Sequence, residues 1–389
     1  MSVAEKRNIV YYRGMRENQT TPNELMYLHA LRMIPEVGNR TLAVLREHFG
    51  GWEAVWHASE TAIREIEGIR SETAKKALSE KRKGIDPKTE WERFLKQGIT
   101  LFTPDHPLYP PLLREIPDHP ETLYVRGSFD WQTLPPMIAI VGSRKHSAYG
   151  EQATLRLSED LTRAGLLVVS GLAFGIDSIA HTAALEAGGE TIAVLGNGVS
   201  DNDITPRSHF PLAQKILGHG ALVSEYPPDF PVTRWTFPER DRIIAGLCLG
   251  TVVIEAPEKS GSLITAQCAL DYNRDVFAIP GSIFSPYSIG TNTLIKKGAK
   301  VVTGIQDILE ELTSENIFPL HSSENQKQST NLAEEEKTLL ASLSHEPLHI
   351  DAIIKKTKFP APVVSSFLAL LEIKGLAKNV GGMHYIRVS

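Results

Sequence analysis

Residues 137–312 alternate short apolar runs with longer segments of helical periodicity. The runs are apolar on both faces, which is typical of strands buried in a parallel sheet between crossover helices. The pattern therefore predicts a doubly wound α/β domain, in which ligands bind beyond the carboxyl ends of the strands. The predicted strands are 137–141, 166–169, 191–195, 221–223, 251–254 and 276–279.

The N-terminal residues 1–83 have the apolar spacing of helices and predict a separate helical domain. Two short segments, 34–39 and 66–70, resemble each other, because each is an apolar turn followed by a helix that opens with polar residues. The arrangement resembles a pair of helix-hairpin-helix (SAM-like) units, whose backbone N–H groups take a DNA phosphate. Each turn keeps one glycine, Gly38 or Gly68, where that pattern has two. A helical packing or protein-contact domain is therefore an equal alternative.

Two further segments frame the α/β domain. Residues 84–136 are rich in proline and in apolar side chains. We expect this connection to pack on the core and to end in a short strand at 123–127. Residues 313–332 are rich in Ser, Asn and Gln, and this composition predicts a flexible linker.

The C-terminal residues 333–389 have the pattern of a winged helix. Three helices are expected at 334–343, 350–356 and 361–374, followed by a β-hairpin about the glycines 381–382. The third helix, which enters the major groove in DNA readers of this kind, carries few cations. A protein-contact or regulatory role is therefore favoured over sequence-specific DNA recognition.

Composition and charge narrow the class of protein. No apolar stretch is long enough to span a bilayer, and residues 1–16 lack the apolar core of a signal peptide, so we expect a cytoplasmic protein without membrane contact. Cys248 and Cys268 form no Cys-x-x-Cys pair, and we expect neither a metal nor a cofactor. The net charge is −5, and residues 137–312 carry 14 Lys and Arg against 19 Asp and Glu. Any nucleic-acid site must therefore be local.

Glycine- and serine-rich turns follow several of the predicted strands. Gly-Ser-Arg (142–144) comes after the first strand, Ser-Gly (170–171) after the second, and Lys-Ser-Gly-Ser (259–262) after the fifth. Glycine lets a ligand approach the backbone, helix N-termini favour anions, and arginine binds phosphate with two hydrogen bonds. One such turn is a weak signal, but several at one edge of a parallel sheet predict a groove for a ligand with several phosphates.

A second signal is the segment 234–242, in which arginines lie close to aromatic residues. An aromatic platform beside cations suits single-stranded nucleic acid, because a base stacks on the ring while the cation binds the backbone. The candidate aromatics are Tyr226, Trp235 and Phe237, and each of them can instead belong to the core.

Enzymatic nucleotide chemistry has less support in the sequence. The chain contains neither Gly-x-Gly-x-x-Gly nor the P-loop pattern. His181 lies one helical turn after Asp177, so the two can pair on one helix face, and a structural histidine is favoured over a catalytic one. The alternative function is that of a Rossmann-like nucleotide hydrolase of the phosphoribohydrolase type. Such enzymes usually show Pro-Gly-Gly-x-Gly-Thr, and that string is absent.

Six motifs taken together resemble the DprA family, also called Smf. They are Val-Gly-Ser-Arg (141–144), Ser-Gly-x-Ala-x-Gly-Ile-Asp (170–177), Phe-Pro-x-Arg-x-Arg-Ile-Ile-Ala-Gly (237–246), Lys-Ser-Gly-Ser-Leu-Ile-Thr-Ala (259–266), Ile-Pro-Gly (279–281) and Gly-Thr-Asn-x-Leu-Ile (290–295). The resemblance covers the middle domain almost fully and the flanking modules in their arrangement.

The resemblance implies an extended Rossmann fold that binds and protects single-stranded DNA. It also implies a homodimer that loads the RecA recombinase onto incoming strands during natural transformation, with no catalytic reaction. Arg207 and Arg234 stand near positions where the family often has lysines. Asp241 stands where the family commonly has asparagine, which puts a negative charge near the DNA path. The predicted DNA-binding residues are Gly142, Ser143, Arg144, Ser170, Gly171, Arg207, Arg234, Phe237, Arg240, Arg242, Lys259, Ser260, Gly261 and Ser262.

Overall fold

The computed structural model describes residues 20–69, 71–230, 233, 235–314, 334–344, 346–373 and 376–388. The chain divides into two compact units, residues 1–319 and residues 320–389. The predicted linker, residues 313–332, lies outside the described residues from 315 onward. No helix among the described residues combines the length and the apolar character needed to cross a membrane.

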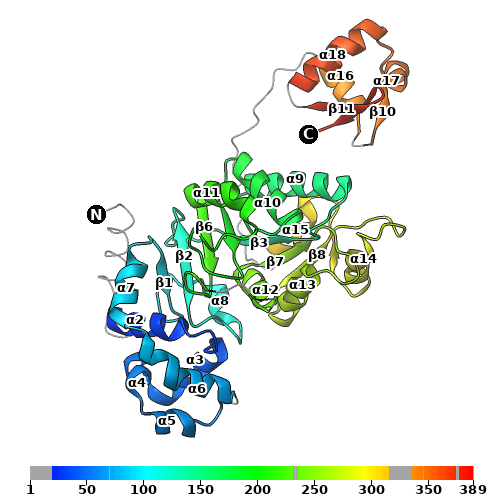
Figure 1. The fold of residues 1–389 in the computed structure, drawn as a ribbon. Helices are drawn as coiled ribbons and strands as arrows, with labels where there is room; N and C mark the ends of the chain where they lie inside the picture. Colours follow the sequence, from blue (N-terminus) through cyan, green and yellow to red (C-terminus); the bar gives the residue numbers. More distant parts are fainter. Residues whose placement is uncertain are drawn as a thin grey trace. The chain divides into compact units, whose positions relative to one another are not determined.

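A twisted sheet runs through the first unit, and the described residues give it nine strands in the order β1-β2-β6-β5-β4-β3-β7-β8-β9 (Figure 1). Neighbouring strands from β6 to β9 are parallel, whereas β1 and β2 join one edge in antiparallel fashion. The strands are β1 (Thr100–Phe102), β2 (Leu123–Gly127), β3 (Met137–Val141), β4 (Leu167–Ser170), β5 (Thr191–Val194), β6 (Gly220–Ser224), β7 (Gly250–Val253), β8 (Asp275–Ala278) and β9 (Lys300–Val301).

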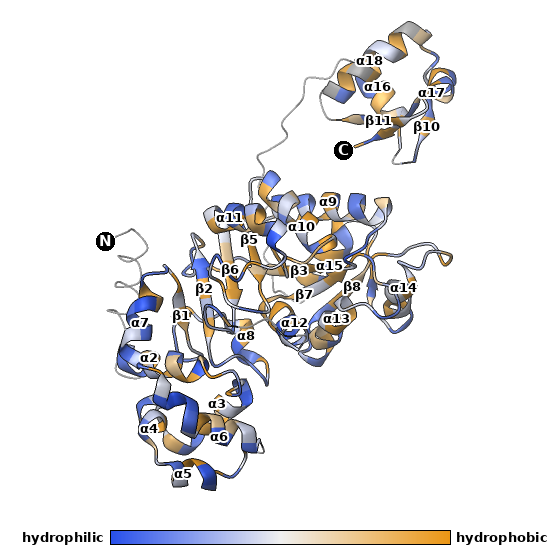
Figure 2. Cartoon of the chain, viewed as in Figure 1, coloured by the Kyte–Doolittle hydropathy of each residue, from blue (hydrophilic) through white to orange (hydrophobic). Residues whose placement is uncertain are grey.

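Helices cover both faces of the sheet. One face packs against α9 (Ala148–Arg163), α10 (Ile176–Glu186), α11 (Phe210–Gly218) and α15 (Ile305–Ser314), and the other against α8 (Pro111–Glu115), α12 (Thr236–Leu247) and α13 (Ser262–Asp271). Alternate residues of β3 therefore enter different cores: Ala139 lies with α12 and α13, and Ile140 lies with α9 and α10. Figure 2 shows the result as apolar strands between helices that are apolar on one side.

The predicted doubly wound α/β fold is confirmed. Each of the six predicted strands is present, with both ends within one residue of the predicted ends. The sequence did not indicate β1 or β9, which have three and two residues.

The N-terminal helices enclose a small core of their own, which includes Leu28, Leu31 and Leu42. The two predicted turns connect α2 to α3 and α5 to α6, although Arg70 lies outside the described residues. The helices are α2 (Pro22–Arg32), α3 (Asn39–Phe49), α4 (Trp52–His57), α5 (Glu60–Glu65) and α6 (Glu72–Glu80), followed by the 3₁₀ turn η1 (Lys81–Gly84) and by α7 (Pro87–Leu95).

Residues 84–136 supply α7, β1, α8 and β2. Trp91 and Phe94 of α7 pack with Leu101 and Tyr124 of the two antiparallel strands, and β2 pairs with β6 of the parallel sheet. The connection is thus continuous with the core of the α/β domain.

The second unit is a winged helix. Its core contains Leu339, Ile353 and Leu368, and its strands pair in the order β10-β12-β11. The elements are α16 (Glu334–Ser342), β10 (Leu348–His349), α17 (Ile350–Thr357), α18 (Ala361–Ile373), β11 (Ala377–Gly381) and β12 (His384–Arg387). The three helices and the hairpin agree with the prediction, which did not include the two-residue strand β10.

Candidate nucleic-acid interface

The order in which the chain adds strands reverses at β3. The strands β4, β5 and β6 lie on one side of β3, and β7 and β8 lie on the other. Ligands of such sheets bind beyond the carboxyl ends of the strands at this point. The loop after β3 is fixed to the end of β7. Ser143 N donates to the Glu255 carbonyl oxygen at 2.8 Å, and Ser147 donates to the Glu255 carboxylate from its backbone N (2.8 Å) and from Oγ (2.5 Å).

The Gly-Ser-Arg turn has an inward part and an outward part. Ser143 is buried, and its hydroxyl donates to the Lys145 carbonyl oxygen and accepts from the Lys145 N–H, so it shapes the turn. A Cβ on Gly142 would lie 2.6 Å from Cγ1 of Ile176, the first residue of α10, so only glycine fits there. Arg144 and Lys145 are exposed. The turn therefore presents two cations to solvent.

The Ser-Gly turn after β4 packs directly on the Gly-Ser-Arg turn. Ser170 is fully buried and donates to the Ile140 carbonyl oxygen at 2.6 Å. Gly175 has φ +78°, and a Cβ there would lie 2.4 Å from the Ser143 carbonyl oxygen and 2.7 Å from that of Arg144. The two turns therefore contact each other backbone to backbone.

Arg240 of α12 is buried beneath these turns. Its Nη1 donates to the Val194 carbonyl oxygen of β5 at 3.1 Å, and its Nε lies 3.0 Å from Oδ1 of Asp241. A Cβ on Gly171 would lie 1.4 Å from the same Nη1. Arg240 is thus enclosed between α12 and the ends of two strands, away from solvent.

Two buried carboxyl groups lie near Arg240. Burial raises the pKa of Asp177, and the charge of Arg240 acts in the opposite direction. Burial also raises the pKa of Asp241 to about 6, although Arg240 and, more weakly, Arg144 favour its ionised form. The ionised form of Asp241 therefore attracts Arg144, although more weakly than it attracts Arg240.

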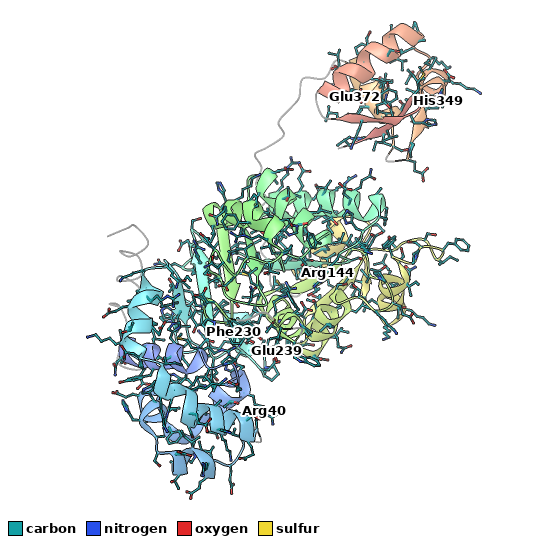
Figure 3. The ribbon with its side chains drawn as sticks, in the orientation of Figure 1. Arg40, Arg144, Phe230, Glu239, His349 and Glu372 are labelled. Carbon is teal, nitrogen blue, oxygen red and sulfur yellow. The ribbon has the colours of Figure 1, made fainter. Side chains whose placement is uncertain are left out.

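Arg144 also contacts an aromatic ring. Its guanidinium carbon lies 5.7 Å from the ring centroid of Phe237, which is half-buried on the first turn of α12. This distance is within the range of a cation–π contact. Figure 3 labels Arg144 and Glu239. Glu239 lies near Phe237 at the start of α12, and its carboxylate accepts a hydrogen bond from Tyr226 Oη. An exposed cation and an aromatic ring thus meet at the point where the strand order reverses.

Two more exposed cations lie on the loops to either side. Arg207, on the 3₁₀ turn η2 (Arg207–His209) between β5 and α11, has its guanidinium carbon 4.4 Å from the Phe210 ring centroid. Lys259 lies in the loop after β7. In that loop Ser260 Oγ lies 2.8 Å from Oγ of the buried Ser262, and Gly261 is exposed.

Arg242 lies elsewhere. It is buried, its Nη2 donates to the Glu225 carboxylate, and its Nη1 donates to the Asp118 carbonyl oxygen. Arg32 of α2 approaches the same carboxylate, with Nη2 at 4.0 Å from Glu225 Oε1. Arg234, another predicted site residue, lies outside the described residues.

The structure separates the predicted residues that it describes by their exposure, and Gly142, Phe237 and Ser260 are intermediate. Arg144, Arg207, Lys259 and Gly261 are exposed at the loops that follow the strands. Ser143, Ser170, Gly171, Arg240, Arg242 and Ser262 are buried.

The sequence interpretation did not single out Phe174 as a site residue. This side chain is 49% exposed at the tip of the turn between β4 and α10. The signal in the sequence is an aromatic residue inside a glycine-rich turn at a strand end, away from the arginine-rich segment 234–242 that contains the candidate aromatics Trp235 and Phe237. Trp235, considered as a core or stacking residue, is 64% exposed.

His181 is fully buried with Nδ1 2.8 Å from Thr191 Oγ1, so it is hydrogen-bonded to β5 and not to Asp177. Burial lowers the pKa of His181 to about 3. Among the described residues no group of three or more His, Cys, Asp and Glu side chains is placed to hold a metal ion.

The fold and its turns define the class of protein. It is a Rossmann-like α/β module with glycine-rich turns at the carboxyl ends of its strands, joined in one chain to a winged helix. Residues 100–313 match the family described as DNA recombination-mediator protein A, and residues 323–383 match the DprA winged helix domain. The chain belongs to this DNA-processing family, known as DprA or Smf.

The first two of the following proteins support this family assignment. Protein Smf of Escherichia coli strain K12 is 39% identical over 346 residues, which cover 87% of this chain and 90% of that protein. The X-ray structure of DNA processing protein A from Streptococcus pneumoniae is 36% identical, covers 74% of this chain and 97% of its own, and has a TM-score of 0.64. A structure of DNA processing protein A from Helicobacter pylori, described by its single-stranded DNA binding mode, is 31% identical and covers 53% and 94%, with a TM-score of 0.49.

Proposed function

We propose that this chain binds single-stranded DNA along the carboxyl edge of its sheet and acts as a recombination mediator, without catalysing a reaction. The observation that carries the proposal is the contact between Arg144 and Phe237. A nucleotide needs both partners, because the cation binds its phosphate and the ring stacks on its base. The two side chains come from different elements and meet at the position where sheets of this kind bind ligands.

The same geometry favours a single strand over a duplex. In a duplex the base faces are stacked on one another, and an aromatic side chain cannot reach them without unstacking the helix. In a single strand every base has a free face, and stacking on an aromatic ring depends little on sequence. We therefore expect little base preference.

The buried predicted residues have a supporting role in this proposal. Ser143 shapes its own turn, and Ser170 joins the end of β4 to β3. Gly171 leaves room for Arg240, which binds β5 and fixes α12 under the turns. Arg242 holds α12 to Glu225. We assign direct contact with the DNA backbone to three exposed cations, Arg144, Arg207 and Lys259, and to the exposed backbone at Gly261.

The biological part of the proposal follows from the family described as recombination mediators. The chain would act in the cytoplasm as a homodimer, protect incoming single strands during natural transformation and load the RecA recombinase onto them. The loading step predicts faster assembly of RecA filaments on oligo-dT that is already coated with single-strand-binding protein. Light scattering of the full chain tests the homodimer.

A gel shift tests the binding proposal itself. We expect oligo-dT to be shifted at a concentration well below that needed for a duplex of the same length. If mononucleotides were hydrolysed while oligo-dT remained unbound, the function would instead be that of a nucleotide hydrolase.

A further inference from the structure

Phe174 is an exposed aromatic residue in an otherwise well-fixed turn. Half of its side chain, 49%, is exposed at the tip of the turn between β4 and α10. Single apolar residues on a protein surface are common and need no special explanation. The position of this one is informative, because the turn is attached on both sides to loops that carry exposed arginines.

On one side, the turn is attached to the loop that carries Arg144. The backbone of Gly175, the residue after Phe174, lies so close to the carbonyl groups of Ser143 and Arg144 that no Cβ fits between them. The N–H of Ile176 donates to the Ser143 carbonyl oxygen at 3.3 Å. The position of Phe174 relative to Arg144 is therefore set by the backbone.

On the other side, the turn is attached to η2, which carries Arg207. The ring centroids of Phe174 and His209 lie 4.9 Å apart with an interplanar angle of 71°, so the two rings meet edge to face. His209 Nδ1 lies 2.9 Å from the Leu172 carbonyl oxygen, which ties η2 to the same turn. Phe174 thus lies in a turn between the loops of two exposed arginines, Arg144 and Arg207.

We propose that Phe174 is a second base-stacking residue of the single-stranded DNA site. One base stacks near Phe237, a neighbouring base stacks on Phe174, and Arg144 and Arg207 bind the phosphates beside them. This inference rests on the proposed function and adds a path for the DNA. The single-stranded DNA runs from α12 across the end of β4 towards η2.

The nature of the ligand group follows from the surroundings. An exposed aromatic ring in a turn between two arginine-bearing loops matches the alternation of flat bases and negative phosphates along a single strand. The edge-to-face contact with His209 holds the ring while leaving half of the side chain open for stacking. Because every base has such a face, this second position would add affinity without adding sequence preference.

Substitutions of Phe174 in the full chain test the proposal. Loss of one base–aromatic stack weakens binding about 5- to 150-fold, so we expect Phe174→Ala to weaken oligo-dT binding by at least about fivefold in fluorescence anisotropy. Phe174→Leu, which keeps an apolar side chain but no aromatic ring, should weaken it similarly, and Phe174→Tyr should bind within about twofold of the parent. Leu270→Ala is the matched control, because Leu270 is 51% exposed in the last turn of α13. That turn lies at the amino ends of the parallel strands, away from the proposed site.

The outcomes distinguish this inference from the proposed function. If Phe174→Ala and Phe174→Leu bind oligo-dT as tightly as the parent while Arg144→Ala binds it weakly, the second stacking position is wrong and the proposed function stands. If the parent itself does not bind oligo-dT, both are wrong. Equal weakening by Phe174→Tyr and Phe174→Ala would also contradict stacking, because tyrosine keeps the ring.

Discussion

Arg240 and Gly171 are in direct contact: a Cβ on Gly171 would lie 1.4 Å from Nη1 of the Arg240 guanidinium. The glycine therefore makes room for a buried cation, and that cation joins α12 to the carboxyl ends of β4 and β5. The relationship explains why a small residue follows β4, and it makes the position of α12, with Phe237 on it, depend on that turn.

Gly171→Ala should both destabilise the protein and weaken DNA binding. The new methyl group must displace Arg240, and overpacking of this kind costs about 1–3 kcal/mol of unfolding free energy. Urea denaturation measures that loss. Gly261→Ala is the matched control for stability, because a Cβ on Gly261 meets nothing within 4 Å. An unchanged denaturation midpoint for Gly171→Ala would show that Arg240 is not held where we place it.

Asp241→Asn should strengthen oligo-dT binding, and the gain should depend on pH. Burial raises the pKa of Asp241 to about 6, so above that pH the carboxylate is charged and competes with DNA for Arg144. We expect the variant to bind more tightly than the parent at pH 8 and equally at pH 5. Glu186→Gln, at the far end of α10, is the control and should show no such divergence.

The same substitution should change the pH dependence of stability. The pKa of Asp241 is raised from 3.8 to about 6 in the folded protein, so the folded state holds the proton more tightly than the unfolded state. The corresponding stability is present below pH 3.8 and is lost as the pH rises through about 6. Each pKa unit corresponds to about 1.4 kcal/mol. The free energy of unfolding of Asp241→Asn should therefore rise relative to that of the parent between pH 4 and pH 6. If the two proteins showed the same pH dependence of stability, the raised pKa of Asp241 would be wrong.

Replacement of Arg242 should affect stability, whereas replacement of Arg144 should affect DNA binding. Arg242 is buried against the Glu225 carboxylate, and breaking a buried ion pair by removing one partner costs about 3–5 kcal/mol. Arg144 is exposed, and its replacement should change stability by about 0.5 kcal/mol or less. We expect Arg242→Ala to lower the melting temperature and Arg144→Ala to lower DNA affinity. Similar melting temperatures for the two variants would contradict this division.

Removal of residues 320–389 should leave most oligo-dT binding intact. The remaining residues form a compact unit of their own, and this unit contains Arg144, Phe237 and the other exposed cations of the proposed site. A near-total loss of affinity in the shortened chain, with its melting temperature unchanged, would assign DNA binding to the winged helix.

Much of the fold was predictable from the sequence because burial on both faces leaves a clear pattern. The six strands predicted from apolar runs lie within one residue of their observed ends. The strands β1, β9 and β10 have two or three residues each, which is too short for any periodicity, and they form only because a longer strand offers hydrogen bonds alongside.

The glycine-rich turns at the strand ends were predictable from the sequence, but burial of their side chains was not. The segment with Arg240 and Arg242 looks like a group of exposed cations in the sequence. Glu225, which pairs with Arg242, lies 17 residues earlier, and the Val194 carbonyl that binds Arg240 lies 46 residues earlier. Only the tertiary structure brings these partners together. Phe174 shows the reverse case, in which an apolar residue in the sequence is exposed in the fold.

The central claim is that Arg144, beside Phe237, binds a phosphate of single-stranded DNA. Binding of oligo-dT to the parent and to Arg144→Ala across a salt series tests it most directly. Each phosphate contact contributes about −0.7 to the slope of log K against log salt for a single strand. We predict weaker binding by Arg144→Ala and a slope that is less negative by about 0.7. Equal affinity and equal slope for the two proteins would contradict the claim.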